Sequence, residues 1–129
     1  MEVCTMKRIL VVDDEQEVLY VFKRLLEQMQ YEFTTCDNWE DALKAYSEKS
    51  YDLAILDVHM PGRDGFQIAK EMRMHNPKQK IMIVTGLSAG DAYQFLSSSD
   101  ADVNEVLYKP FSVEKVKTMI GGLLEQETP

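Results

Sequence analysis

Cysteine is scarce in this chain of 129 residues: only Cys4 and Cys36 occur, together with two histidines. So few of these residues suit neither a disulfide framework nor a zinc site, and both cysteines are expected to be reduced thiols. The chain also lacks repeats, low-complexity stretches and linkers rich in proline, serine or glycine. We therefore expect residues 1–129 to form one domain around a single core.

Basic residues are also in deficit, because 14 lysines and arginines face 22 aspartates and glutamates, for a net charge of −8. A negative chain argues against direct binding of nucleic acid, whose phosphates attract basic surfaces. The chain has no apolar run long enough for a membrane span, and acids follow the run Ile9–Val12 where a signal peptide would carry small residues. These absences predict a cytoplasmic protein that binds no nucleic acid directly and inserts into no membrane.

Short apolar runs alternate with amphipathic stretches along the whole chain. Runs without in-and-out alternation are typical of strands buried on both faces of a parallel sheet, and apolar residues spaced three or four apart are typical of helices. Strands are predicted over residues 7–12, 31–36, 53–57, 81–84 and 105–108. Helices are predicted over residues 15–29, 39–46, 64–76, 89–97 and 113–124. This alternation predicts an α/β fold, a doubly wound five-stranded parallel sheet with helices on both faces.

Polar residues stand at the carboxyl ends of most of these strands. Asp13 and Asp14 follow the first strand, Asp57 ends the third, Thr85 follows the fourth and Lys109 follows the fifth. In open α/β sheets this edge carries the ligand-binding crevice, so these residues are candidates for a functional site. An aspartate there also suits a turn, and Asp57 by itself does not decide between the two interpretations.

Asp13, Asp14 and Asp57 would repel one another at this edge unless a cation lies among them. Few ligands, all of them oxygen, describe a Mg²⁺ site better than a Ca²⁺ cage, and no set of His and Cys ligands is present for zinc. Thr85 and Lys109 add a hydroxyl donor and a positive charge, which suit the oxygens of a phosphoryl group. Asp57 then serves as a nucleophile whose attack on phosphorus gives an acyl phosphate.

Several motifs, occurring in order, carry a resemblance to a known family. They are Val12-Asp13-Asp14-Glu15, Asp57 followed by Met60-Pro61-Gly62 and Asp64-Gly65, Thr85-Gly86, and Lys109-Pro110-Phe111. Each motif alone is weak, but together they span nearly the whole chain, which resembles the receiver domain of bacterial two-component response regulators and, in extent, the chemotaxis-type single-domain regulators. The resemblance implies a flavodoxin-like (βα)5 fold with strand order 2-1-3-4-5. It also implies a phosphoacceptor signalling domain that phosphorylates and dephosphorylates itself, and not an enzyme that turns over a substrate.

The same resemblance assigns a Mg²⁺ site. Asp57 resembles the phosphoacceptor and Asp14 a direct metal ligand, with Asp13 holding the metal through water. The main-chain carbonyl of His59 would complete the protein's ligands. The His59 side chain stands at a position that resembles one that varies in the family and modulates dephosphorylation, so a catalytic role for its ring is the less favoured interpretation.

Partners also follow from the resemblance. Thr85 resembles the family's hydroxyl residue, which moves toward the phosphoryl group. Lys109 resembles the lysine that pairs with that group. The expected phosphodonor is a sensor histidine kinase or a phosphotransfer protein, and the signal is expected to pass to a downstream protein or an output domain. Residues 125–129 fit both a natural end and the start of a linker, so a receiver domain cut from a larger regulator or hybrid kinase remains an open alternative.

The chain departs from the family pattern near its fifth strand. The position three before Lys109 usually holds an aromatic that moves inward with the strand-four hydroxyl, and here it is Val106. Tyr108 is expected to be no substitute, on the argument that side chains alternate between the faces of a strand. Asp102-Val103 also replaces the usual small Gly-Ala pair. We therefore expect the phosphorylation chemistry to be retained and the aromatic switch to be altered.

Two other functions use a similar edge of a sheet. A phosphatase of the haloacid dehalogenase type also attacks phosphate with a strand-end aspartate, but it carries a second acid where this chain has His59, and no cap domain fits in 129 residues. An electron-transfer flavodoxin needs a loop rich in Ser, Thr and Gly after the first strand. Here the acids at 13–15 would repel the flavin phosphate, so the receiver interpretation is favoured.

Overall fold

The computed structural model describes residues 6–99 and 102–125, and Cys4 lies outside them. Its strands are β1 (Arg8–Val12), β2 (Glu32–Cys36), β3 (Leu53–Asp57), β4 (Lys80–Thr85) and β5 (Glu105–Tyr108). Its helices are α1 (Gln16–Gln28), α2 (Trp39–Glu48), α3 (Gly65–His75), α4 (Ala89–Ser99) and α5 (Val113–Glu125). Every predicted strand and helix is therefore present. Cys36 is buried and free, as predicted.

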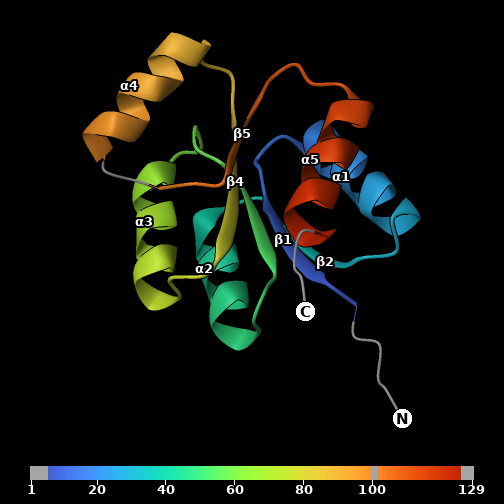
Figure 1. The fold of residues 1–129 in the computed structure, drawn as a ribbon. Coiled ribbons are helices and arrows are strands. Elements are labelled where there is room, and N and C mark those ends of the chain that lie inside the picture. The colour runs from blue at the N-terminus through green and yellow to red at the C-terminus, as the bar shows by residue number, and fades with distance from the viewer. Residues whose placement is uncertain (1–5, 100–101, 126–129) are drawn as a thin grey trace.

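The strands form one parallel sheet in the order β2-β1-β3-β4-β5 (Figure 1). From β1 the chain first adds β2 on one side and then β3, β4 and β5 on the other. In such sheets the ligand crevice lies where the winding reverses, between β1 and β3. Val12 pairs with Leu56 in register, so the ends of these two strands lie side by side. The predicted doubly wound, flavodoxin-like fold with order 2-1-3-4-5 is confirmed.

Alternate side chains of the central strands pack into two separate hydrophobic layers. In β1, Leu10 and Val12 belong to the layer that includes α2 and α3, whereas Ile9 and Val11 belong to the layer that includes α1 and α5. Figure 1 shows these two pairs of helices on opposite faces of the sheet, with α4 next to α3. All 5 residues of β3 are buried, which explains the unbroken apolar run in the sequence. No helix of the described ranges is long and apolar enough to cross a membrane.

The loop between β3 and α3 is held close to the end of β3. Asp64 caps α3 by accepting a hydrogen bond from the Phe66 N–H at 2.9 Å. A Cβ atom on Gly65 would lie only 2.6 Å from the Val58 Cα, closer than side-chain carbons normally approach a backbone. The Asp64-Gly65 motif therefore fixes the path of the loop that directly follows Asp57.

The side chains of β5 correct one expectation. Leu107 is buried in the layer of α1 and α5, so Val106 and Tyr108, one residue to each side of it, lie on the opposite face. The expectation that Tyr108 cannot share the face of Val106 is wrong, because residues two apart in a strand point the same way. Tyr108 is also the register partner of Thr85. An aromatic residue of β5 thus stands beside the strand-four hydroxyl, two residues nearer the carboxyl edge than Val106.

Gly65→Ala should lower the free energy of unfolding by about 2 to 4 kcal/mol, because the added Cβ forces α3 away from Val58. Gly122→Ala is the matched control, since Gly122 is exposed in α5 and nothing lies within 4 Å of a Cβ placed there. The control should raise the free energy of unfolding by up to about 1 kcal/mol through its better helix propensity. Urea unfolding measures both, and equal effects of the two substitutions would argue against a close approach at Gly65.

Candidate functional site

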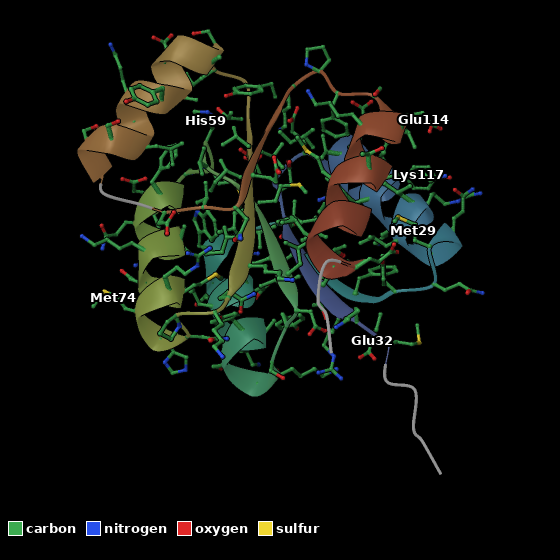
Figure 2. The ribbon with its side chains drawn as sticks, in the orientation of Figure 1. Met29, Glu32, His59, Met74, Glu114 and Lys117 are labelled. Atoms are coloured by element: carbon green, nitrogen blue, oxygen red, sulfur yellow. The ribbon has the colours of Figure 1, made fainter. Side chains whose placement is uncertain are left out.

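The carboxyl-terminal edge of the sheet carries a pocket of about 440 Å³. The pocket is lined by Asp14, Glu15, Asp57, His59, Gly86, Leu87 and Lys109. Asp57 ends β3 and Thr85 ends β4, while Asp13 and Lys109 directly follow β1 and β5. Figure 2 shows the His59 side chain at this edge, between α4 and the strands. The fold therefore gathers the residues that the sequence predicts for the site.

Three carboxylates form a cluster that could hold a metal ion. Each of Asp13, Asp14 and Asp57 offers one oxygen, and these oxygens all lie within 4.8 Å of one another. Asp13 and Asp57 are buried, with 1% and 3% of their surface exposed, whereas Asp14 is exposed. Asp13 Oδ2 is buried, and the Lys109 ammonium nitrogen lies 3.2 Å from it. Crowded acidic oxygens of this kind fit a hard divalent cation such as Mg²⁺.

Backbone N–H groups hold the two buried carboxylates in the same way. The Glu15 N–H donates to Asp13 Oδ1 at 2.8 Å, and the His59 N–H donates to Asp57 Oδ1 at 2.9 Å. In both cases the donor lies two residues after the aspartate, so each carboxylate is fixed by the turn that leaves its own strand. The second oxygen of each carboxylate, Oδ2, lies near Lys109.

Lys109 brings a positive charge to the cluster. Its Nζ lies 2.5 Å from Glu15 Oε1, 3.2 Å from Asp13 Oδ2 and 3.3 Å from Asp57 Oδ2. Burial by itself lowers the pKa of Lys109, but the hydrogen bonds and charges of the three carboxylates outweigh it and raise the pKa above its ordinary value. Lys109 is therefore charged at neutral pH.

Glu15 is a site residue to which the sequence argument gives no role. It stands in the motif after β1 as a third acid, and its carboxylate is the nearest partner of the Lys109 ammonium group. The position of Glu15 after β1 indicated where the site lies, but not what Glu15 does in it. Its pairing with a lysine 94 residues away follows only because the segments after β1 and β5 meet at one edge of the sheet.

Among the acids of the site, Asp13 has a clearly shifted pKa. Burial raises the pKa of Asp13 to about 6, against an ordinary value of 3.8. The hydrogen bond from the Glu15 N–H lowers it, the charge of Asp57 raises it, and Lys109 lowers it again. Desolvation and a neighbouring negative charge thus outweigh the groups that stabilise the ionised form.

Thr85 is fully buried, and it is not among the residues that line the pocket. Its Oγ1 accepts a hydrogen bond from the Leu87 N–H at 3.0 Å and lies 2.6 Å from His59 Nε2. The sequence favours a role for the His59 main chain over one for its ring, so the ring contact is an additional finding. The predicted use of the His59 carbonyl as a metal ligand stays a prediction.

The sequence of the chain matches a known protein family. The sequence model of the family described as "Response regulator receiver domain" matches residues 9–121. The chain belongs to this family. The resemblance inferred from the strand-end motifs is thereby confirmed, and the chain contains a receiver domain of two-component response regulators.

Individual relatives of this receiver domain agree. The transcriptional regulatory protein ResD of Bacillus subtilis is 29% identical over 119 residues, which make up 92% of this chain and 48% of ResD. The response regulator TrrA of Thermotoga maritima, solved in complex with Mg(2+)-BeF, is 36% identical with a TM-score of 0.80, and the match covers 92% of this chain and 100% of that one. DrrB, a Thermotoga maritima OmpR/PhoB homolog, is 27% identical with a TM-score of 0.83, over 96% of this chain and 55% of that one. The chain spans about half the length of the curated relatives it matches.

Asp13→Asn should stabilise the metal-free protein at neutral pH. Because the folded-state pKa of about 6 exceeds the ordinary 3.8, the folded protein binds more protons than the unfolded chain between these pH values, and stability falls as the pH rises through them. The variant lacks this loss, so it should gain up to about 3 kcal/mol in free energy of unfolding at pH 7.5 and little near pH 4.

Urea unfolding in the presence of a chelator, at several pH values, measures this difference. Asp37→Asn serves as the control, because Asp37 is an exposed acid outside the carboxylate cluster. The control should show little pH-dependent gain. A gain for Asp13→Asn that stays constant from pH 4 to pH 7.5 would contradict the raised pKa.

Proposed function

We propose that this receiver domain accepts a phosphoryl group on Asp57 from a phosphorylated histidine of a sensor histidine kinase or a phosphotransfer protein. The observation that carries the proposal is the environment of Asp57: a buried carboxylate with Oδ1 fixed by the His59 N–H and Oδ2 beside the Lys109 ammonium group. A fixed carboxylate needs no base to act as a nucleophile, and a cation at its reacting oxygen suits a phosphoryl group.

In the proposed reaction, Asp57 Oδ2 attacks phosphorus in line with the bond to the donor's imidazole nitrogen. The new O–P bond forms as the P–N bond breaks, and the bonding electron pair leaves with the imidazole. The product is an acyl phosphate on Asp57. Lys109 lies 3.3 Å from the attacking oxygen, so its charge can pair with an oxygen of the transferred group. Thr85 would donate its hydroxyl to another of these oxygens.

Mg²⁺ is the proposed metal, held by Asp14 and Asp57 directly, by Asp13 through water, and by the main-chain carbonyl of His59. The three carboxylate oxygens within 4.8 Å of one another support this set, as does the Mg(2+)-BeF complex of the related TrrA. When bound, a divalent cation offsets negative charge on both the carboxylates and the transferred group. The protein supplies fixed oxygens at one edge and leaves Asp14 open to solvent.

The proposed output is a change in what the receiver domain binds, not the turnover of a substrate. Self-phosphorylation and hydrolysis of the acyl phosphate would start and end this state. A downstream protein or an output domain would recognise the phosphorylated form. ResD and PhoP of Bacillus subtilis, which are transcriptional regulatory proteins by name, are about twice as long as this chain, in keeping with an output region outside the matched part.

Asp57→Asn should abolish covalent phosphorylation, because an amide oxygen is a poor nucleophile and gives no acyl phosphate. With Mg²⁺ and acetyl phosphate, the parent should gain the mass of a single phosphoryl group, and the adduct should be labile to base. Asp64→Asn is the matched control, because Asp64 lies in the loop after Asp57 but caps α3, a role that asparagine fills equally well.

Intact-mass spectra report the outcome directly. The control should be phosphorylated like the parent, while Asp57→Asn should show no adduct. An adduct of unchanged yield in Asp57→Asn would reject Asp57 as the acceptor.

Asp14→Ala should weaken Mg²⁺ binding by at least about tenfold, since it removes one carboxylate from a three-acid site. The fold should be retained or slightly stabilised without metal, because one like charge is removed from the cluster. Calorimetric titration with Mg²⁺ measures the affinity, and Glu17→Ala controls for the loss of an exposed acid near the site that lies outside the cluster. Unchanged Mg²⁺ affinity in Asp14→Ala would exclude Asp14 as a ligand.

A further inference from the structure

The contact between His59 and Thr85 joins the loop after β3 to the end of β4. His59 lies in the loop after β3, two residues beyond Asp57, and its Nε2 is 2.6 Å from Oγ1 of Thr85 at the end of β4. The Leu87 N–H already donates to the same oxygen at 3.0 Å. When the imidazole carries its proton on Nδ1, Nε2 accepts a hydrogen bond from the Thr85 O–H, and the hydroxyl then has a partner on each side.

This pair of hydrogen bonds keeps the hydroxyl out of the pocket. His59 and Leu87 line the pocket, whereas Thr85 has no exposed surface and is not part of the lining. A group that enters the pocket therefore meets the His59 ring before it meets the Thr85 hydroxyl. In that tautomer, the Thr85 O–H must leave Nε2 before it can donate to a phosphoryl group on Asp57.

We propose that His59 is a positioning residue whose ring holds the Thr85 hydroxyl in the resting arrangement and competes for it with the phosphoryl group. The inference rests on the proposed function, because it concerns the same hydroxyl and the same acceptor site. A contact made only in the resting state stabilises that state and lowers the apparent affinity for any ligand that requires the other. His59 thus sets how readily the receiver domain enters its phosphorylated arrangement.

The residues around Thr85 support a role for its contact with His59. β5 offers Val106 beside Ile83, while its aromatic residue, Tyr108, stands beside Thr85 itself. Tyr108 is thus the register partner of Thr85, and the His59 ring contacts the Thr85 hydroxyl. The His59 ring is the member of this pair that bonds the hydroxyl and also lines the pocket, so it is the one that an incoming anion meets.

The test measures the affinity of the protein for beryllofluoride at saturating Mg²⁺ by calorimetric titration. Beryllofluoride is a phosphoryl mimic that is not hydrolysed, so effects of His59 on dephosphorylation do not enter. His59→Leu should bind beryllofluoride about threefold to tenfold more tightly, because the resting state loses one hydrogen bond that the bound state does not use. His59→Gln places an amide near the position of Nε2 and should bind nearly like the parent.

Two further proteins separate the hydrogen bond from other effects of the substitution. His75→Leu removes the other histidine of the chain, an exposed residue at the far end of α3, and should leave the affinity unchanged. Thr85→Val removes the hydroxyl while keeping the side-chain shape. In a Thr85→Val background, His59→Leu should cause no further change in affinity, because no hydroxyl remains to be released.

The outcomes discriminate between mechanisms. Weaker binding by His59→Leu would mean that the ring contacts the bound anion, and it would overturn the proposal. Tighter binding of equal size with and without the Thr85 hydroxyl would mean that His59 only obstructs the pocket, and it would also overturn the proposal. A parent that does not bind beryllofluoride would reject the proposed function and this inference together, whereas the first two results leave the proposed function intact. His59→Ala repeats the comparison if His59→Leu does not fold.

Discussion

Several carboxylates are held at one edge of the sheet around the ammonium group of Lys109, and the arrangement of the site depends on this balance of charge. Lys109 Nζ lies within 3.3 Å of oxygens of Glu15, Asp13 and Asp57. Buried like charges oppose folding, and the lysine offsets part of that cost. The raised pKa of Asp13 shows that the offset is incomplete. On the proposed function, a divalent cation would offset the remaining negative charge of the carboxylates and that of the transferred phosphoryl group.

The parallel sheet holds these charged side chains in place. β1 and β3 are neighbours, so Asp13 and Asp57 are carried on adjacent strand ends. Lys109, just after β5, reaches Asp57 across β4 and Asp13 across both β4 and β3. Apolar layers on both faces fix the strands, and each buried aspartate is held by a backbone N–H two residues further on. The charged groups therefore rest on rigid elements, which is how a site keeps its geometry without a ligand.

The site also contains a second group of contacts, which surrounds Thr85 at the end of β4. Its hydroxyl meets the Leu87 N–H and the His59 ring, and Tyr108 is its partner in the sheet. Tyr108 was predicted to lie on the face opposite Val106, which is wrong, although strand alternation alone was sufficient to place it correctly. The His59 contact is of another kind, because a ring orientation in a loop depends on the neighbouring strand and no spacing in the sequence encodes it.

The sequence by itself determined the order of strands and helices, the family, and the convergence of Asp13, Asp14, Asp57, Thr85 and Lys109 at one edge. It could do so because apolar runs identify buried strands and because the carboxyl ends of parallel strands share an edge. Only the tertiary structure decided which side chains pair there: Glu15 with Lys109, and His59 with Thr85. Each of these pairs joins loops distant in sequence, and their distances depend on how strands and loops pack, which local residue patterns do not specify.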